Sequence, residues 1–407
     1  MKQLSKMMLA AVASVALAAP AFAWDFGASG SSTASFNSTS TKASKDATNT
    51  IASGGVTSSA SSLKLSSSHT DGPKSLSLSY TLDWDGNLDE TITLSGSSKV
   101  GDWTASGDVS YNRDRPGCYA TDNGSGTALV AATAGCQGQT GEDTTAVTVT
   151  DGTMTIKLGD ASHLSGQNVS SNGAAAGAVS FDAADDDASV GAFVGAFQGV
   201  SLGYKISDTM SATVAYQASL DTADACGAGE AYDGEGASHG ITATGLGFSG
   251  TFGIASVGFT MCNAATADAG TASVSPASTS TATSTMGIGV KLDLGDIDPF
   301  ISFGTYSAVG SVSKAGAAYA GNEVGLTYAL GNDTVVFYIG SVTEIVTPSG
   351  GVAGEAITKS GMELGYNTMV GPASLKVGYG SQTHAQTGGS TDGYSMTDIE
   401  VAMTYGF

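Results

Sequence analysis

Polar and apolar residues alternate along much of this 407-residue chain. The last stretch, Ser395 to Phe407, shows the pattern most clearly, because Ile399, Val401 and Met403 are separated by single polar or small residues. Strict alternation predicts a β-strand with one apolar and one polar face, since successive side chains on a strand point to opposite sides. The pattern recurs from a first strand near Trp24 to Phe36 onward, and it predicts an all-β protein.

So many one-faced strands indicate a sheet that closes on itself. A closed sheet has no unpaired edge, and a barrel with apolar side chains outside is one of only two structures that can span lipid. The alternation gives 18 strands, or 16 if one early pair lies outside the wall. We therefore expect a transmembrane antiparallel up-and-down β-barrel whose lumen is filled with water.

Turn signals separate the predicted strands. Asp151-Gly152 is a strong signal for a two-residue hairpin loop, and Gly371-Pro372 is expected to form a second tight turn. We expect a further turn at Ser249-Gly250, between a strand with Ala243 and one with Phe252. Short turns of this kind alternate with long polar segments, which is the asymmetry of periplasmic turns and extracellular loops in outer-membrane barrels.

The N-terminus has the pattern of a secretory signal. Lysines precede an apolar run from Met7 to Ala19, and Ala21-Phe22-Ala23 provides an A-x-A cleavage site. The run is shorter than the 18 or so apolar residues that a spanning helix needs. We expect residues 1–23 to be a signal peptide and residues 24–407 to form the barrel domain.

The composition excludes some classes of protein. The chain has a formal net charge of -22 at pH 7, and so acidic a chain disfavours nucleic acid as a partner. Only 13% of the residues are charged and 57 are glycine, which is also typical of some disordered chains. The alternation argues against disorder, because polar and apolar residues follow a period of two.

Four cysteines, Cys118, Cys136, Cys226 and Cys262, fall in polar, glycine-rich segments that we interpret as loops between strands. In an exported protein they indicate two disulfides, although four cysteines permit three connectivities. Proximity in the sequence favours Cys118–Cys136, which leaves Cys226–Cys262. A zinc site is the alternative, but no Cys-x-x-Cys motif or nearby histidine supports it.

The charged residues within predicted strands fall on the polar parity. A charge facing lipid at the bilayer midplane costs about 2 to 4 kcal/mol, so we expect these side chains to line the lumen. The expected basic lining residues are Lys64, Lys99, Lys157, Lys205, Lys291 and Lys376. The expected acidic lining residues are Asp83, Asp108, Asp293, Glu323, Glu363 and Glu400.

Two features resemble known families. The terminal Phe407 on an alternating strand resembles the assembly signal of Gram-negative outer-membrane proteins. The segment from Asp151 to Ala161, which leads into a long acidic loop, is similar to the segment before the constriction loop of alphaproteobacterial-type trimeric porins. This resemblance implies a homotrimer in outer-membrane lipid, inserted by the barrel-assembly machinery.

The resemblance also implies that the loop from Ser162 to Ala188 folds into the barrel and narrows it. Its carboxylates would face lysines of the wall, with Lys157, Lys205, Lys64 and Lys99 as candidates. The carboxylates in question are Asp182, Asp185, Asp186 and Asp187. An acidic loop that stays in solvent, or that binds Ca²⁺ through its carboxylates, is the alternative, and no other cofactor is expected.

We expect a porin of the bacterial outer membrane, with a cation-selective channel for passive diffusion of ions and small hydrophilic solutes. A substrate-specific outer-membrane channel is one alternative, and a structural or adhesive surface β-protein is another. An enzyme is not expected. The histidines, which we assign to turns or loops, show no spacing to serine and acid that suggests a catalytic triad; they are His69, His163, His239 and His384.

Overall fold

The computed structural model describes residues 25–48, 50–84, 88–115, 142–161, 163–164, 197–220, 241–266, 282–309, 318–346, 355–386 and 392–407. Within these ranges no helix is long and apolar enough to cross a membrane. The regular elements are the strands β1 (Asp25–Lys42), β2 (Ile51–Asp71), β3 (Lys74–Trp84), β4 (Leu88–Val100), β5 (Trp103–Arg115), β6 (Glu142–Thr150), β7 (Met154–Ala161), β8 (Phe197–Ser207), β9 (Met210–Leu220), β10 (Ile241–Phe252), β11 (Ala255–Thr266), β12 (Ala282–Leu292), β13 (Ile297–Val309), β14 (Ala318–Leu330), β15 (Asp333–Val346), β16 (Glu355–Val370), β17 (Ala373–Ala385) and β18 (Ser395–Gly406).

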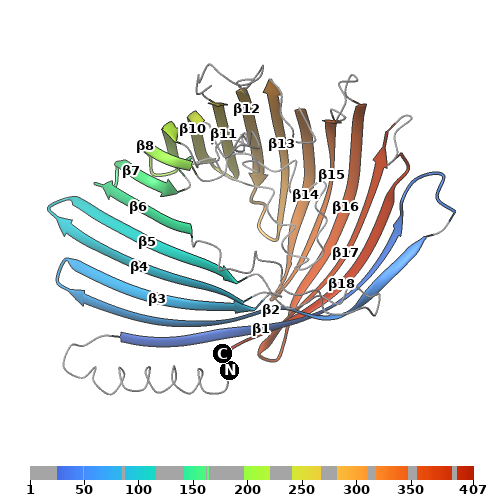
Figure 1. Cartoon of the computed structure of the whole chain (residues 1–407), viewed down its shortest axis with the longest axis horizontal. Helices are drawn as coiled ribbons and strands as arrows, with labels where there is room; N and C mark the ends of the chain where they lie inside the picture. Colours follow the sequence, from blue (N-terminus) through green and yellow to red (C-terminus); the bar gives the residue numbers. More distant parts are fainter. Residues whose placement is uncertain are drawn as a thin grey trace, which may run out of the picture. The chain divides into compact units, whose positions relative to one another are not determined.

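The strands form one antiparallel sheet of 18 strands in chain order. Strand β1 pairs with both β2 and β18, so the sheet closes on itself. Neighbouring strands such as β14 to β17 run side by side in alternating directions (Figure 1). The predicted all-β barrel is confirmed, with the larger of the two expected strand numbers.

The chain forms two compact units. The N-terminal unit comprises Met1–Thr33, Ser58–Asp151 and Gly406–Phe407, and the C-terminal unit comprises Ala34–Thr57 and Gly152–Tyr405. Strands β3 to β6 lie wholly in the N-terminal unit, whereas β7 to β17 lie wholly in the C-terminal unit.

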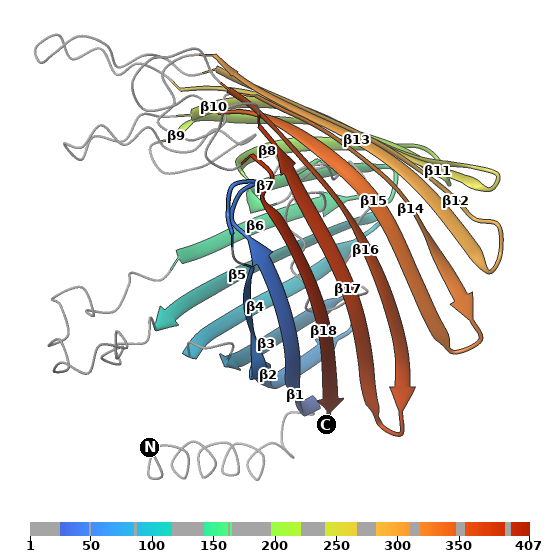
Figure 2. The same cartoon turned by 90° about the vertical axis from the view of Figure 1, so that its right-hand side faces the viewer.

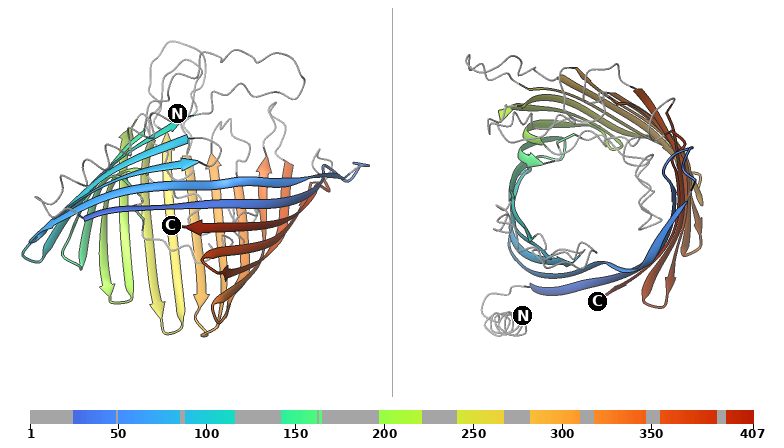
Figure 3. Two further views of the ribbon diagram at one scale, coloured as in Figure 1. Left: turned by 90° about the horizontal axis from the view of Figure 1, so that it is seen from below. Right: turned by 45° about the vertical axis from the view of Figure 1, so that its right-hand side comes forward.

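Tight turns join strands where the sequence predicted them. Gly152 and Gly371 have φ angles of 88° and 63°, in the left-handed region that glycine adopts without a steric penalty. The hairpin of β16 and β17 around Gly371 can be followed in Figure 2. Within the C-terminal unit, the short turns of β10–β11, β12–β13 and β14–β15 lie along one edge (Figure 3).

The prediction of a turn at Ser249-Gly250 is wrong. Strand β10 continues to Phe252, and the chain turns at Gly253, whose φ is 65°. Gly250 is instead a strand residue beside two aromatic rings, because a Cβ there would lie 3.1 Å from the ring of Phe248 and 2.9 Å from that of Phe252. The glycine signal therefore reflects ring packing within the strand, and β11 begins later than expected.

Apolar side chains are exposed on the outer face of the sheet. Leu364, Tyr379 and Ile399 are direct partners across β16, β17 and β18, and they are 44%, 37% and 49% exposed. Directly paired residues of antiparallel strands share a face, so these side chains form one continuous apolar band. This arrangement is the reverse of a water-soluble protein and fits a wall that faces lipid.

The C-terminal residue closes onto the first strand within the N-terminal unit. The amide of Gly30 donates to the carbonyl oxygen of Phe407 at 2.7 Å, and the amide of Phe407 donates to that of Gly30 at 2.9 Å. A Cβ at Gly30 would lie 2.6 Å from the ring of Phe407. Gly30 therefore makes room for the terminal aromatic ring, which the sequence pattern singled out.

Candidate channel lining

Four carboxylates lie on the inner face of the C-terminal unit, opposite the exposed apolar band. Glu323 of β14, Glu363 of β16, and Asp398 and Glu400 of β18 are 0%, 3%, 8% and 5% exposed. Glu323, Glu363 and Glu400 were expected on this face from their parity. Asp398 was not singled out, although it shares the parity of Glu400 and that signal could have identified it.

Glycines lie beside these carboxylates on neighbouring strands. Glu363 and Asp398 are both direct partners of Gly380, on its two sides, and Glu400 is a partner of Gly378. Glu323 is likewise a partner of Gly340. Because glycine has no side chain, the long carboxylate side chains have room to lie along the wall.

Hydroxyl groups donate hydrogen bonds to three of the carboxylates. The phenol of Tyr338 donates to Glu363 Oε2 at 2.5 Å, and the hydroxyl of Ser302 donates to Glu323 Oε2 at 3.3 Å. Thr39 of β1 donates to Asp398 Oδ1 at 2.9 Å. Burying a carboxylate is costly unless hydrogen bonds compensate, and these three hydroxyls each supply one such bond.

Lysines occupy the same inner face. Lys157, Lys205, Lys291 and Lys376 alternate with outward apolar residues in the C-terminal unit, as expected from the sequence. Lys291 Nζ lies 3.2 Å from Asp298 Oδ2. Lys359, which sequence reasoning missed, faces inward on β16 as the direct partner of His384.

One expected acidic residue lies outside the strands. Asp293 follows the end of β12, and its Oδ1 accepts a hydrogen bond from the amide of Gly295 at 3.1 Å. Its side chain therefore stabilises the β12–β13 turn. Strand β12 ends at Leu292, so Asp293 does not continue its inward-outward alternation as the sequence pattern suggested.

The inner face of the N-terminal unit is lined by hydroxyl groups. Pairs of serines and threonines on adjacent strands lie within hydrogen-bond distance of one another: Ser31–Ser62 at 2.9 Å, Ser75–Ser97 at 2.7 Å, Ser77–Ser95 at 2.7 Å and Thr93–Ser110 at 2.8 Å. The expected charges Lys64, Lys99 and Asp108 lie on this face and are exposed, and Asp83 is half-buried.

The segment after β7 lies against the inner face of the C-terminal unit. His163 is 4% exposed, with Nε2 2.8 Å from the carbonyl oxygen of Gly159 and Nδ1 2.9 Å from Ser201 Oγ. Leu164 packs on β10, because a Cβ at Gly245 would lie 2.8 Å from its Cδ atoms. The start of the predicted constriction loop therefore follows the inner wall.

The aspartates of that loop, Asp182, Asp185, Asp186 and Asp187, lie outside the described residues, and their role stays a prediction. Within the described part of the chain, no group of three or more His, Cys, Asp or Glu side chains could hold a metal ion. Because the acidic loop lies outside the described residues, Ca²⁺ binding by its carboxylates also stays a prediction.

Three residues that the sequence analysis assigned to loops or turns lie in strands. Cys262 lies within β11, is fully buried and is disulfide-bonded. Its predicted partner Cys226, like Cys118 and Cys136, lies outside the described residues, so the pairing stays a prediction. His69 lies in β2 and His384 in β17, where His384 Nε2 is 2.9 Å from Gln382 Nε2.

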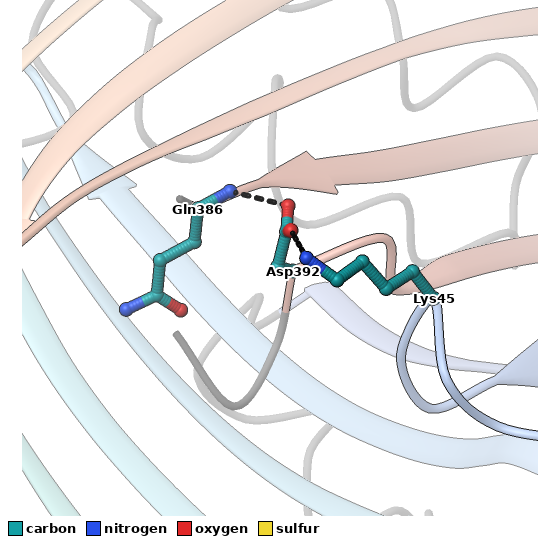
Figure 4. A network of polar contacts seen from close by, with 3 residues as sticks. All are labelled: Lys45, Gln386 and Asp392. Carbon is teal, nitrogen blue, oxygen red and sulfur yellow. Dashed lines mark hydrogen bonds and ion pairs between the residues drawn. The ribbon is translucent and has the colours of Figure 1, made fainter. Parts of the chain in front are cut away.

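An ion pair joins the β1–β2 and β17–β18 connections of the C-terminal unit (Figure 4). Lys45 Nζ lies 2.7 Å from Asp392 Oδ2, and the amide of Gln386 donates to Asp392 Oδ1 at 3.0 Å. The hydrogen bond from Lys45, followed by that from Gln386, lowers the pKa of Asp392 below 3.8. The bond to Asp392 raises the pKa of Lys45 above 10.5.

Neither a protein-family model nor a curated protein sequence matches the chain. The chain is similar to the structure of OpdQ from Pseudomonas aeruginosa, with a TM-score of 0.53 and 11% identity over 94% of this chain and 98% of that one. OpdL of the same organism gives a TM-score of 0.50 and 11% identity over 94% and 99%. The outer membrane channel DcaP of Acinetobacter baumannii gives a TM-score of 0.49 and 13% identity over 96% of this chain and 99% of that one.

At such low identity the comparisons show the fold alone. The expected location in the bacterial outer membrane agrees with that fold and with the exposed apolar band. The narrower resemblance to alphaproteobacterial-type trimeric porins stays a prediction. The chain shares the fold of OpdQ, and its own sheet is a closed barrel of 18 antiparallel strands.

Proposed function

We propose that this protein is an outer-membrane channel through which ions and small hydrophilic solutes diffuse passively, with a preference for cations. The observation that supports it best is the set of four inner-face carboxylates, Glu323, Glu363, Asp398 and Glu400, behind an apolar outer face. A barrel of 16 to 18 strands leaves an aqueous lumen. Fixed negative charge on its wall raises the local concentration of cations and lowers that of anions.

Single-channel recording in a planar bilayer tests the proposed pore. Purified protein should insert with large, ohmic conductance steps in KCl. Vesicles that contain the protein should also swell in neutral sugars at rates that fall smoothly with sugar size. Absence of conductance and of swelling from correctly folded protein would exclude a diffusion pore.

A substrate-specific channel is the second candidate, and the pocket with two lysines on the wall of β7 to β9 favours it. The same swelling assay separates the candidates. A diffusion pore discriminates by size and charge, whereas a specific channel admits one solute faster than others of equal size and charge and saturates with it.

We further propose assembly into a homotrimer in outer-membrane lipid, as the sequence resemblance implies. Chemical cross-linking in native outer membranes should give a ladder that ends at three copies. We also propose that the barrel-assembly machinery recognises Phe407. Its removal should reduce the amount of folded barrel in the membrane, whereas Phe407→Tyr should retain most of it.

A further inference from the structure

A cavity of about 320 Å³ opens on the inner face of the C-terminal unit, where β7, β8 and β9 adjoin. We call it the lysine pocket and define it by Thr155, Lys157, His163, Gly203, Lys205 and Thr213. Its polar side chains are hydroxyls, two lysines and a histidine, and its described lining includes no aspartate or glutamate. In a chain with a net charge of -22 this local composition is unusual.

The middle of the pocket is a glycine between two threonines. Thr155 pairs with Gly203, which pairs in turn with Thr213, so the three residues form one row across three strands. A Cβ at Gly203 would lie 3.4 Å from Thr213 Oγ1 and 3.6 Å from Thr155 Cβ. Because glycine occupies the middle of the row, the wall between the two threonines carries no side chain.

The two lysines lie on opposite sides of this row. Lys157 is the next inward residue after Thr155 on β7, and Lys205 is the next inward residue after Gly203 on β8. The strands are antiparallel, so the two lysines flank the row on its two sides along the strand direction. Both lysines line the same cavity as the two threonines.

His163 forms a wall of the pocket through its ring. Nε2 must be protonated, since the carbonyl oxygen of Gly159 at 2.8 Å can only accept. In the neutral ring, Nδ1 then accepts from the hydroxyl of Ser201 at 2.9 Å. With both nitrogens engaged, the imidazole ties residue 163 to β7 and β8 and leaves ligand binding to the lysines and threonines.

An existing ion pair does not close the pocket. Lys205 Nζ lies 2.7 Å from Asp208 Oδ1, but the Asp208 side chain is 96% exposed in the β8–β9 turn. A pair so open to solvent is weak. An ammonium group has three donors, so Lys205 can bind a second acceptor while it keeps Asp208.

We propose that the lysine pocket binds the anionic oxygen group of a small solute, such as a phosphate, sulfate or carboxylate group. Ammonium-to-oxyanion hydrogen bonds are among the strongest in proteins, and threonine hydroxyls supply further donors. The cavity has the size of a small-ligand site. Binding at this point does not require that the barrel conducts, so this proposal and the proposed function can fail separately.

Inorganic phosphate is the probe, titrated by calorimetry into the purified full chain in detergent, with ionic strength held constant by NaCl. Wild-type protein should bind phosphate saturably. Lys157→Gln and Lys205→Gln should each weaken binding about tenfold or more, the usual effect of losing a charge-assisted hydrogen bond. Lys64→Gln removes the same charge from the inner face of the N-terminal unit and should change binding by less than about twofold.

A second variant tests the glycine between the two threonines. Gly203→Ala keeps both lysines and adds a methyl group at contact distances that a strand tolerates, so the barrel should fold and phosphate binding should weaken. No saturable binding by wild-type protein would overturn the proposal. If Lys64→Gln weakened phosphate binding as much as the pocket variants do, the proposal would also be overturned. Phosphate would then be attracted by the overall charge of the inner wall and not by the lysine pocket.

Discussion

The inner faces of the two units differ although the same alternation produced both. In the N-terminal unit the inner positions of β3 and β4 are mainly serine and threonine, joined across strands by contacts such as Ser77–Ser95 at 2.7 Å. In the C-terminal unit the inner positions of β14 to β18 combine glycine with buried carboxylates such as Glu363. Period-two alternation thus identifies the polar face of the sheet, but not whether hydroxyl groups or charged groups line it.

The difference has a steric cause. Serine or threonine at most inner positions of β3 and β4 leaves hydroxyls beside one another, so they can form hydrogen bonds across strands without a charged partner. Glycines such as Gly378 and Gly380 leave space that longer acidic side chains on neighbouring strands can fill. We infer that the carboxylates of the C-terminal unit dominate selection by charge, whereas the N-terminal unit provides a hydroxyl-rich surface that also carries the exposed charges Lys64, Lys99 and Asp108.

The largest expected effect follows from removing charge from the C-terminal wall. In a variant with Glu363→Gln, Asp398→Asn and Glu400→Gln, the ratio of K⁺ to Cl⁻ permeability should fall on the order of threefold, because the wall loses three acidic groups. The measurement is the reversal potential under a KCl gradient. Asp108→Asn on the N-terminal wall serves as the control, and an equal fall there would contradict the comparison.

A smaller effect is expected from the hydrogen bond that supports a buried carboxylate. Tyr338→Phe removes the donor to Glu363 and should lower the free energy of unfolding by about 1 to 3 kcal/mol, the cost of a buried acceptor that loses its partner. Urea unfolding in detergent or lipid vesicles measures it. Ser77→Ala, in the hydroxyl-lined unit, should cost no more than about 1 kcal/mol; the reverse order would refute the distinction between the two walls.

The anchor of the predicted constriction loop gives a comparable steric test. Gly245→Val places methyl groups where Leu164 packs and should destabilise the barrel by about 1 to 3 kcal/mol, the usual effect of overpacking. Gly107→Val is the matched change in the N-terminal unit, where a Cβ would meet its nearest neighbour at 3.5 Å. It should shift stability by only about 0.5 kcal/mol. Equal thermal midpoints for both variants would argue against the packing of Leu164 on β10.

The smallest effect concerns the ion pair between Lys45 and Asp392. The pKa of Asp392 is lowered, so its stabilising contribution is complete above pH 3.8 and is lost as the pH falls through the lowered value. The pKa of Lys45 is raised, so its contribution is complete below pH 10.5 and is lost above the raised value. The contact should therefore persist across neutral pH and weaken in acid.

Hydrogen exchange measures this contact. The Lys45 amide donates to the Asp392 carbonyl oxygen at 2.7 Å, and the Lys99 amide donates to that of Pro73 at 3.0 Å in the N-terminal unit. After correction for the intrinsic rates, protection of Lys45 relative to Lys99 should fall below pH 3.8. A constant ratio would show that the ion pair does not hold the two connections together.

The sequence predicted the fold and much of the wall because both depend on local period. Parity alone predicted that Glu323, Glu363 and Glu400 lie on the inner face, where the structure places them. The Asp151-Gly152 signal predicted the turn in which Gly152 has a positive φ. The turn at Gly250 was wrong because glycine also serves ring packing within a strand. That error shifted β11 and so moved Cys262 from a loop into the wall.

Contacts that depend on closure of the sheet could not be predicted. Lys45 and Asp392 are 347 residues apart in the chain, and Thr39 reaches Asp398 over 359 residues. Burial of the carboxylates likewise depends on which glycines become their cross-strand partners. Period identifies a face, whereas register among distant strands determines which side chains meet on it.

We infer that the inner wall of the C-terminal unit makes the channel cation-preferring. The most direct test is the sign of the zero-current potential of wild-type protein in a planar bilayer that separates dilute from concentrated KCl. The account predicts a potential displaced toward the equilibrium potential of K⁺. A potential displaced toward that of Cl⁻ would contradict it and would indicate that lysines, rather than carboxylates, control passage.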